Sequence, residues 1–143
     1  MRVCTFFGHH DCTDEIQPEL RKLLIDLIEN QSADEFYVGN QGAFDRIVRS
    51  VLRELKTAYP NIRYSVVLAY MPQKRGELDM RDFSDTMLPE GIEEIPPRFA
   101  ISWRNNWMLR RADTVIVYVK HSWGGAAQFA EQAERQKKTV IRL

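Results

Sequence analysis

The sequence predicts an α/β protein, a Rossmann-like three-layer sandwich built on a mainly parallel sheet of about five strands. The main observation is that short apolar runs alternate with longer segments of helical spacing along almost all of the 143 residues. A second observation is that several of these runs end at a glycine or a polar loop just before a helical segment. Alternation of this kind is typical of a parallel sheet with helices on both faces.

Five short runs are expected to be strands, because they are apolar and rich in β-branched or aromatic side chains. They cover residues 2–7, 35–38, 63–70, 114–119 and 139–143. Four segments repeat apolar side chains every three or four positions and are expected to be helices. These segments are 16–30, 44–59, 97–111 and 125–137.

The segment 71–97 interrupts this alternation. It holds six glycines and prolines together with many charged side chains. We expect a long excursion with at most short helices, and loops of that length inside a compact domain are usually functional. The acidic stretch around Glu77, Asp79, Asp82 and Asp85 is a candidate lid.

Composition excludes several classes of protein. Lysine plus arginine and aspartate plus glutamate both number 20, and the formal net charge of zero argues against a protein that holds nucleic acid through broad phosphate contacts. No apolar run approaches the length of a membrane span, and the first residues lack the layout of a signal peptide. The sequence has only two cysteines, and we expect a cytoplasmic protein with free thiols. From the charge balance and the lack of an apolar span, we expect no nucleic-acid partner and no membrane partner.

A metal site is not expected. Cys4, His9, His10 and Cys12 lie close together in the sequence, but their spacing matches no standard zinc pattern. The sequence contains no signal for another cofactor. A role of His9 or His10 as a polar contact to a ligand fits their place after a strand better.

Three loops carry the residue types that a phosphorylated ligand needs, and each follows a predicted strand. They cover residues 8–12, 39–45 and 121–128. Glycines allow backbone N–H groups to approach an anion, and the helix that follows supplies further donors and a favourable dipole. The alternative is that these glycines only permit tight turns. The candidate ligand-binding residues are Gly8, His9, Gly39, Asn40, Gln41, Gly42, Asp45, Ser122, Trp123, Gly124, Gly125 and Gln128.

Two of these residues have a second interpretation each. Asp45 would lie in the first turn of a helix, where a carboxylate suits the dipole, or it would accept a hydrogen bond from a ribose hydroxyl. Trp123 lies in a loop and is a candidate for stacking on a base, whereas Trp107 is expected in the core.

The stretches 6–9, 39–45 and 122–127 resemble the SLOG superfamily, which joins the Smf/DprA proteins and the lonely-guy (LOG) phosphoribohydrolases. The sequence looks closest to the DUF1273/YpsA-like branch of small bacterial and phage proteins. The resemblance covers nearly the whole chain and implies one SLOG-like Rossmannoid domain over residues 1–143. It also implies a nucleotide or nucleotide-derived ligand, such as an ADP-ribose-like molecule or a nucleoside monophosphate.

LOG enzymes cleave the N-glycosidic bond of nucleoside monophosphates, and two residues of this sequence match positions of their motifs. Arg104 takes the place of an arginine that would clamp the phosphate, and Glu131 that of a glutamate that would stabilise positive charge on the ribose. Without catalysis, Glu131 would pair with Arg135 on a helix surface and Arg104 would be solvated.

Several positions depart from the LOG pattern. Asn105, Trp123, Ala127 and Gln128 stand where LOG proteins have lysine, proline, glycine and threonine. We therefore expect ligand binding without turnover as the main function. Two alternatives stay open, a phosphoribohydrolase and a DprA-like accessory protein of DNA processing. LOG relatives form dimers, so the resemblance also implies a possible homodimer.

Overall fold

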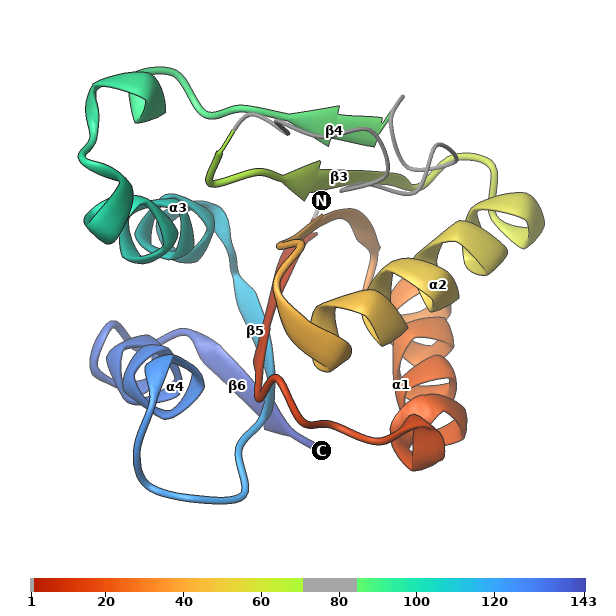
Figure 1. Cartoon of the computed structure of the whole chain (residues 1–143). Helices are drawn as coiled ribbons and strands as arrows, with labels where there is room; N and C mark the ends of the chain where they lie inside the picture. Colours follow the sequence, from red (N-terminus) through yellow and green to blue (C-terminus); the bar gives the residue numbers. More distant parts are fainter. Residues whose placement is uncertain (1, 71–84) are drawn as a thin grey trace.

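In the part of the chain that the structure describes, the sheet has six strands, all parallel to their neighbours, in the order β4-β3-β2-β1-β5-β6 (Figure 1). The computed structural model describes residues 2–70 and 85–143. The strands are β1 (Arg2–Gly8), β2 (Ala33–Val38), β3 (Arg63–Val67), β4 (Thr86–Met87), β5 (Thr114–Tyr118) and β6 (Thr139–Arg142). The predicted α/β class with a parallel sheet is confirmed.

The sixth strand, β4, was not predicted. It lies in the segment 71–97, where we expected at most short helices, and it consists of two residues that pair with Val66 and Val67. Leu68 N–H also donates to the carbonyl of Met87 at 2.9 Å. A strand of two residues shows no alternation in the sequence, so only its pairing with β3 defines it. Most of the proposed acidic lid falls in 71–84 and lies outside the described residues.

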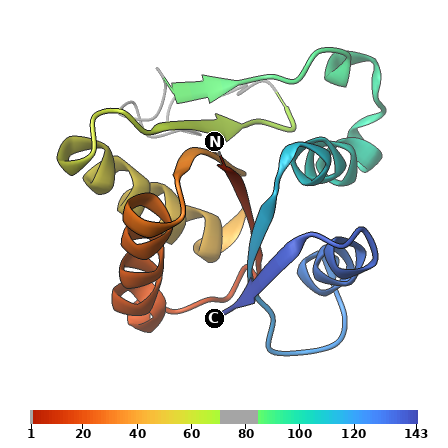
Figure 2. The ribbon, with the colours of Figure 1, turned by 180° about the vertical axis from the view of Figure 1, so that it is seen from behind.

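Among the described residues, four α-helices form the outer layers, and Figures 1 and 2 show helices on both faces of the sheet. They are α1 (Gln17–Asn30), α2 (Gly42–Ala58), α3 (Pro97–Arg111) and α4 (Gly125–Arg135). Helices α1 and α2 cover one face, and α3 and α4 cover the other. Helix α2 buries one continuous stripe at helical spacing, formed by Phe44, Ile47, Val48, Val51, Leu52 and Leu55.

The side chains of strand β5 contribute to the core on both faces of the sheet. They alternate, so that Ile116 packs in the cluster under α1 and α2 while Val115 and Val117 pack under α3 and α4. Among the described residues, no helix combines the length and the apolar character required to cross a membrane.

The order of the strands creates a crevice between β1 and β5. The chain passes from β1 to α1 on one face of the sheet, and from β5 to α4 on the other. The loops that follow these two neighbouring strands therefore diverge at the carboxyl edge of the sheet. Ligands of open parallel sheets bind at such a switch point.

Gly8 ends β1 at this crevice and is packed against the ring of Phe44. A Cβ atom on Gly8 would lie 2.2 Å from Cγ of Phe44, whereas a Cβ atom on Gly125 would have no heavy atom within 4 Å. We expect Gly8→Ala to lower the free energy of unfolding by about 1–3 kcal/mol, because the buried ring has to move. Gly125→Ala is the matched control and should be neutral or slightly stabilising. Urea unfolding of both variants tests this, and equal stabilities would contradict it.

Candidate ligand-binding cleft

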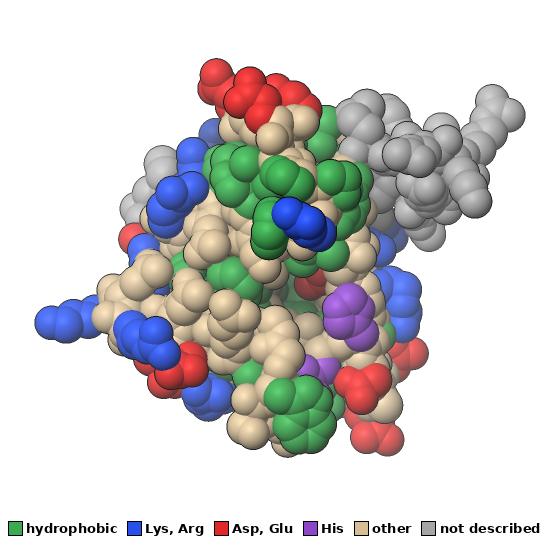
Figure 3. Space-filling view, turned by 60° about the vertical axis from the view of Figure 1, so that its left-hand side comes forward, with side chains coloured by type: hydrophobic (Ala, Val, Ile, Leu, Met, Phe, Trp, Pro, Cys, Tyr) green, Lys and Arg blue, Asp and Glu red, His purple; other side chains and the backbone are tan. Residues whose placement is uncertain are grey.

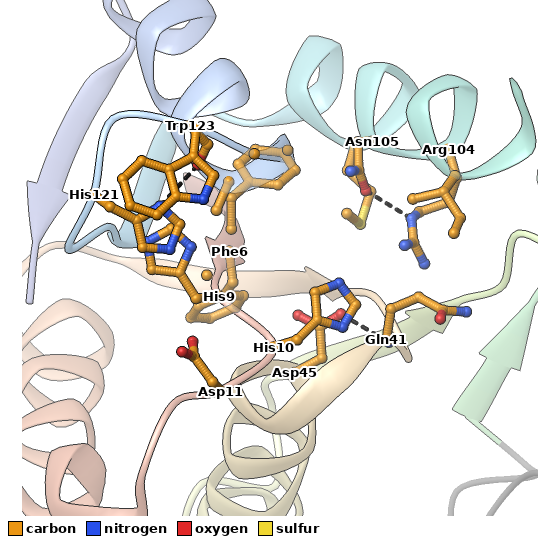
Figure 4. Close-up of a pocket in the computed structure, with 17 residues that line it drawn as sticks. Phe6, His9, His10, Asp11, Gln41, Asp45, Arg104, Asn105, His121 and Trp123 are labelled. Carbon is orange, nitrogen blue, oxygen red and sulfur yellow. Dashed lines mark hydrogen bonds between the residues drawn. The ribbon is translucent and has the colours of Figure 1, made fainter.

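A cleft of about 350 Å³ opens at the carboxyl ends of β1 and β5, between α3, the start of α2 and the start of α4. Figure 3 shows this hollow, with histidine and hydrophobic side chains at its border, and Figure 4 shows its lining. The volume lies within the range of small-molecule sites. The lining residues are Phe6, Phe7, Gly8, His9, His10, Asp11, Gln41, Asp45, Ile101, Arg104, Asn105, Met108, His121, Trp123, Gly124, Gly125 and Ala126.

The structure brings together nine of the residues singled out from the sequence. These are Gly8, His9, His10, Gln41, Asp45, Arg104, Trp123, Gly124 and Gly125. The other candidates do not line the cleft, and they are Gly39, Asn40, Gly42, Ser122, Gln128 and Glu131. Their assignment to ligand binding or catalysis stays a prediction.

Glu131 is separated from the cleft by its position on α4. Its side chain is 63% exposed and forms an ion pair with Arg135, four residues further along the helix. This is the surface pairing weighed as the alternative to catalysis. The structure therefore does not bring Arg104 and Glu131 to one site.

Arg104 is almost fully buried, with 2% of its surface exposed, and is not the solvated helix residue considered from the sequence. Its Nη1 donates to the carbonyl of Val67 at 2.7 Å, and its Nε donates to Oδ1 of Asn105 at 2.8 Å. The guanidinium thus connects α3 to the end of β3. Burial lowers the pKa of Arg104, and the nearby carboxylate of Asp45 opposes that shift.

Asp45 faces Arg104 across the backbone of Gly39. A Cβ atom on Gly39 would lie 2.7 Å from both Nη1 of Arg104 and Oδ2 of Asp45, so the two charged groups approach each other where only a glycine leaves space. Asp45 is 8% exposed. Burial raises the pKa of Asp45, while Arg104 and the backbone N–H of Gln41 act to lower it.

The loop 39–45 uses its own backbone donors. Oδ2 of Asp45 accepts from the N–H of Gln41 at 3.0 Å, and the N–H of Ala43 donates to the carbonyl of His10 at 3.0 Å. Gly42 adopts a φ of +84°, which permits this turn. With a carboxylate already at the start of α2, this loop is a poor place for a phosphate.

The start of α4 is different. Gly124 adopts a φ of +93°, and the position of a Cβ on Gly125 is open space next to the cleft. The first N–H groups of a helix have no partner within the helix. Gly124, Gly125 and Ala126 line the cleft, so this helix end offers donors and a positive dipole to a ligand.

Three aromatic rings form a parallel stack along the wall of the cleft (Figure 4). The ring centroids of His9 and His121 are 3.7 Å apart, and those of His121 and Trp123 are 3.9 Å apart. The backbone N–H of Lys120 donates to Nε2 of His9 at 2.9 Å, so His9 is neutral with its proton on Nδ1. Burial lowers the pKa of His9, and the neighbouring His121 adds to this shift.

Sequence reasoning missed several lining residues. Ile101, Asn105 and Met108 lie at positions i, i+4 and i+7 of α3, and this helical spacing would have found them once Arg104 was chosen. His121 lies three residues after the end of β5 and was included only as part of its loop. Among residues 2–70 and 85–143, no group of histidine, cysteine and acidic side chains is arranged to hold a metal ion.

We expect Arg104→Met to lower the free energy of unfolding at pH 7 by about 3 kcal/mol, because the variant buries the Asp45 carboxylate without its counter-charge. The double variant with Asp45→Asn should recover part of this loss, since the amide is neutral and still accepts from Gln41. The loss in the single variant should also shrink as the pH falls and Asp45 takes up a proton. Urea unfolding at two pH values measures both effects, and equal losses in the single and double variants would contradict the coupling.

His9 should make stability depend on pH. Because the folded state lowers its pKa below the ordinary value of 6.5, the unfolded chain takes up the proton first as the pH falls. At pH 8 His9 is neutral in both states, so its titration does not change the free energy of unfolding. This free energy declines as the pH falls below about 6.5. His9→Gln keeps an acceptor for Lys120 N–H but does not titrate, so its unfolding free energy should fall less between pH 7 and pH 5. Identical slopes for the two proteins would refute this role of His9.

No family model matches the sequence, and no curated protein is significantly similar to it. Among solved structures, the fold is similar to DNA processing protein A (DprA) from Streptococcus pneumoniae, with a TM-score of 0.73 and 13% sequence identity. The match covers 99% of this chain and 50% of that chain, so this chain spans about half the length of that DprA. The comparison gives no support to the expectation that nucleic acid is not a partner. At this identity it shows the fold alone: the chain has the Rossmann-like fold of part of DprA.

Proposed function

We propose that this protein binds a nucleotide-derived small molecule in the cleft between β1 and β5. The observation that carries the proposal is that the open end of α4, with Gly124 and Gly125, faces the same cleft as the buried carboxylate of Asp45. One group suits a phosphate and the other suits hydroxyl donors. A nucleotide carries both a phosphate and a ribose.

The phosphate would bind at the start of α4. The unpaired N–H groups of the first helical turn donate to its oxygens, and the positive end of the helix dipole favours its charge. Arg104 is not needed for this role, because two of its N–H groups already donate to Val67 and Asn105. Its charge still lowers the cost of an anion in the cleft.

The ribose would bind next to Asp45. An ionised carboxylate only accepts hydrogen bonds, so it repels a phosphate and attracts the hydroxyl groups of a sugar. Arg104 opposes the effect of burial on the pKa of Asp45 and so helps to maintain the acceptor form. This favours the ribose interpretation of Asp45, although the same carboxylate also accepts from Gln41 at the start of α2.

Binding without turnover is the form of this proposal that the site supports best. The phosphoribohydrolase alternative, drawn from the LOG motif, relies on Glu131, which lies on the exposed surface of α4 in an ion pair with Arg135 and does not line the cleft. The DprA-like fold and the three resembling loops also support placing the chain in the SLOG superfamily. Within it, we propose the DUF1273/YpsA-like branch on the sequence resemblance.

A role in DNA processing is the second candidate, and the likeness of the fold to DprA favours it. Single-stranded DNA binding would depend steeply on salt. Fluorescence anisotropy with a labelled oligonucleotide at low and high salt tests this candidate. Binding that adenosine 5′-monophosphate (AMP) does not displace would support a DNA surface separate from the cleft.

The substitution Gly125→Asp tests the phosphate site. The added side chain has open space, and a carboxylate in the first turn of a helix stabilises the helix. We expect AMP to bind at least about tenfold more weakly, because the carboxylate and the phosphate repel each other, while the melting temperature stays equal or rises. Isothermal titration calorimetry and thermal melts measure the two effects.

Gln136→Glu adds the same charge just after the other end of α4 and is the matched control, with affinity expected to be unchanged. Glu131→Gln tests the hydrolase alternative in the same samples. Release of free base by the wild type, abolished in Glu131→Gln, would establish turnover in place of mere binding. If the wild type binds none of AMP, ADP-ribose and NAD, the proposed function is refuted.

A further inference from the structure

Trp123 lies at the border of the cleft and is far more exposed than tryptophan usually is in a folded protein. Its side chain is 69% exposed, the largest value among the exposed large hydrophobic residues of the described chain. A tryptophan normally buries most of its ring, because the ring is large and mainly apolar. An exposed tryptophan beside a cleft therefore indicates a surface that a ligand covers.

The ring of Trp123 is held in place by two histidine rings stacked on one of its faces. His121 stacks on it with an interplanar angle of 19°, and His9 stacks on His121 with an angle of 16°. His9 is 7% exposed and is fixed by the N–H of Lys120, while Nδ1 of His121 donates to the carbonyl of Trp123 at 3.0 Å. Each ring thus has a partner or a hydrogen bond that fixes its orientation before any ligand arrives.

One face of Trp123 is covered by His121, and the exposed fraction leaves its other face to solvent (Figure 4). A flat aromatic group is what such a face takes, because stacking removes apolar ring surface from water on both sides. The ordered rings also reduce the entropy that binding would cost.

We propose that the stack of His9, His121 and Trp123 is a platform for the base of the ligand, which lies on the outer face of Trp123. This inference rests on the proposed function and adds the class of ligand: a nucleotide with its base intact, with purines preferred because they overlap more of the indole. Trp123 determines specificity for the base, and it acts separately from the phosphate site at Gly125. One short stretch, 123–125, then contacts both ends of the ligand.

The test compares AMP with ribose 5-phosphate, which lacks the base. Trp123→Leu should bind AMP about tenfold to a hundredfold more weakly than the wild type and should bind ribose 5-phosphate equally well. Trp123→Phe keeps an aromatic face and should recover part of the affinity for AMP. Phe99→Leu removes another exposed aromatic ring, outside the cleft lining, and should change neither affinity.

Fluorescence gives a second readout. Stacking of a base should quench the emission of Trp123, so AMP should quench the wild type and should quench Trp123→Phe much less at saturation. The platform is refuted if Trp123→Leu binds AMP like the wild type, or if it loses affinity for both ligands equally. If the wild type binds neither ligand, the proposed function fails together with this inference, whereas AMP binding without dependence on Trp123 refutes the platform alone.

Discussion

The approach of Arg104 to Asp45 across Gly39 is the interaction on which the rest of the site depends. It joins α3, the end of β2, the end of β3 and the start of α2 at one buried point. A buried charge is tolerated only where opposite charge and hydrogen bonds compensate for the lost water. Arg104 supplies the charge, and Gly39 leaves the space. The same interaction places a carboxylate in the cleft and keeps the arginine away from solvent.

The two walls of the cleft consequently differ in chemistry. The wall at α2 and α3 carries an acceptor with its counter-charge, whereas the wall at α4 carries free N–H donors and a row of stacked rings. The sequence predicted the same role for the loops 39–45 and 121–128, as places where glycines suit a phosphorylated ligand. In the structure Gly39 allows a close approach and Gly42 a turn, whereas Gly124 and Gly125 form the open end of a helix.

The departures from the LOG pattern fit this division, whereas the likeness to DprA extends to the fold alone. A fold is shared by proteins of different activity, and its function depends on the groups at its sites. In this chain the arginine that matches the LOG position is buried in contacts to the protein, and the matching glutamate pairs with Arg135 on the surface. Matching positions in a motif therefore did not imply matching surroundings.

The sequence alone determined the fold class, and it predicted the four α-helices and five of the six strands found in the described residues, because periodicity in the chain reflects the burial of each element. It also located the loops after β1 and β5, since glycines at strand ends are visible without a structure. It did not reveal β4, whose two residues are a strand only by pairing with β3. Only the tertiary structure decided that Arg104 faces Asp45, that His9, His121 and Trp123 stack, and that Glu131 lies elsewhere. Arg104 meets Asp45 and His9 meets His121 across long stretches of sequence, and the energies of these contacts come from burial that no local pattern records.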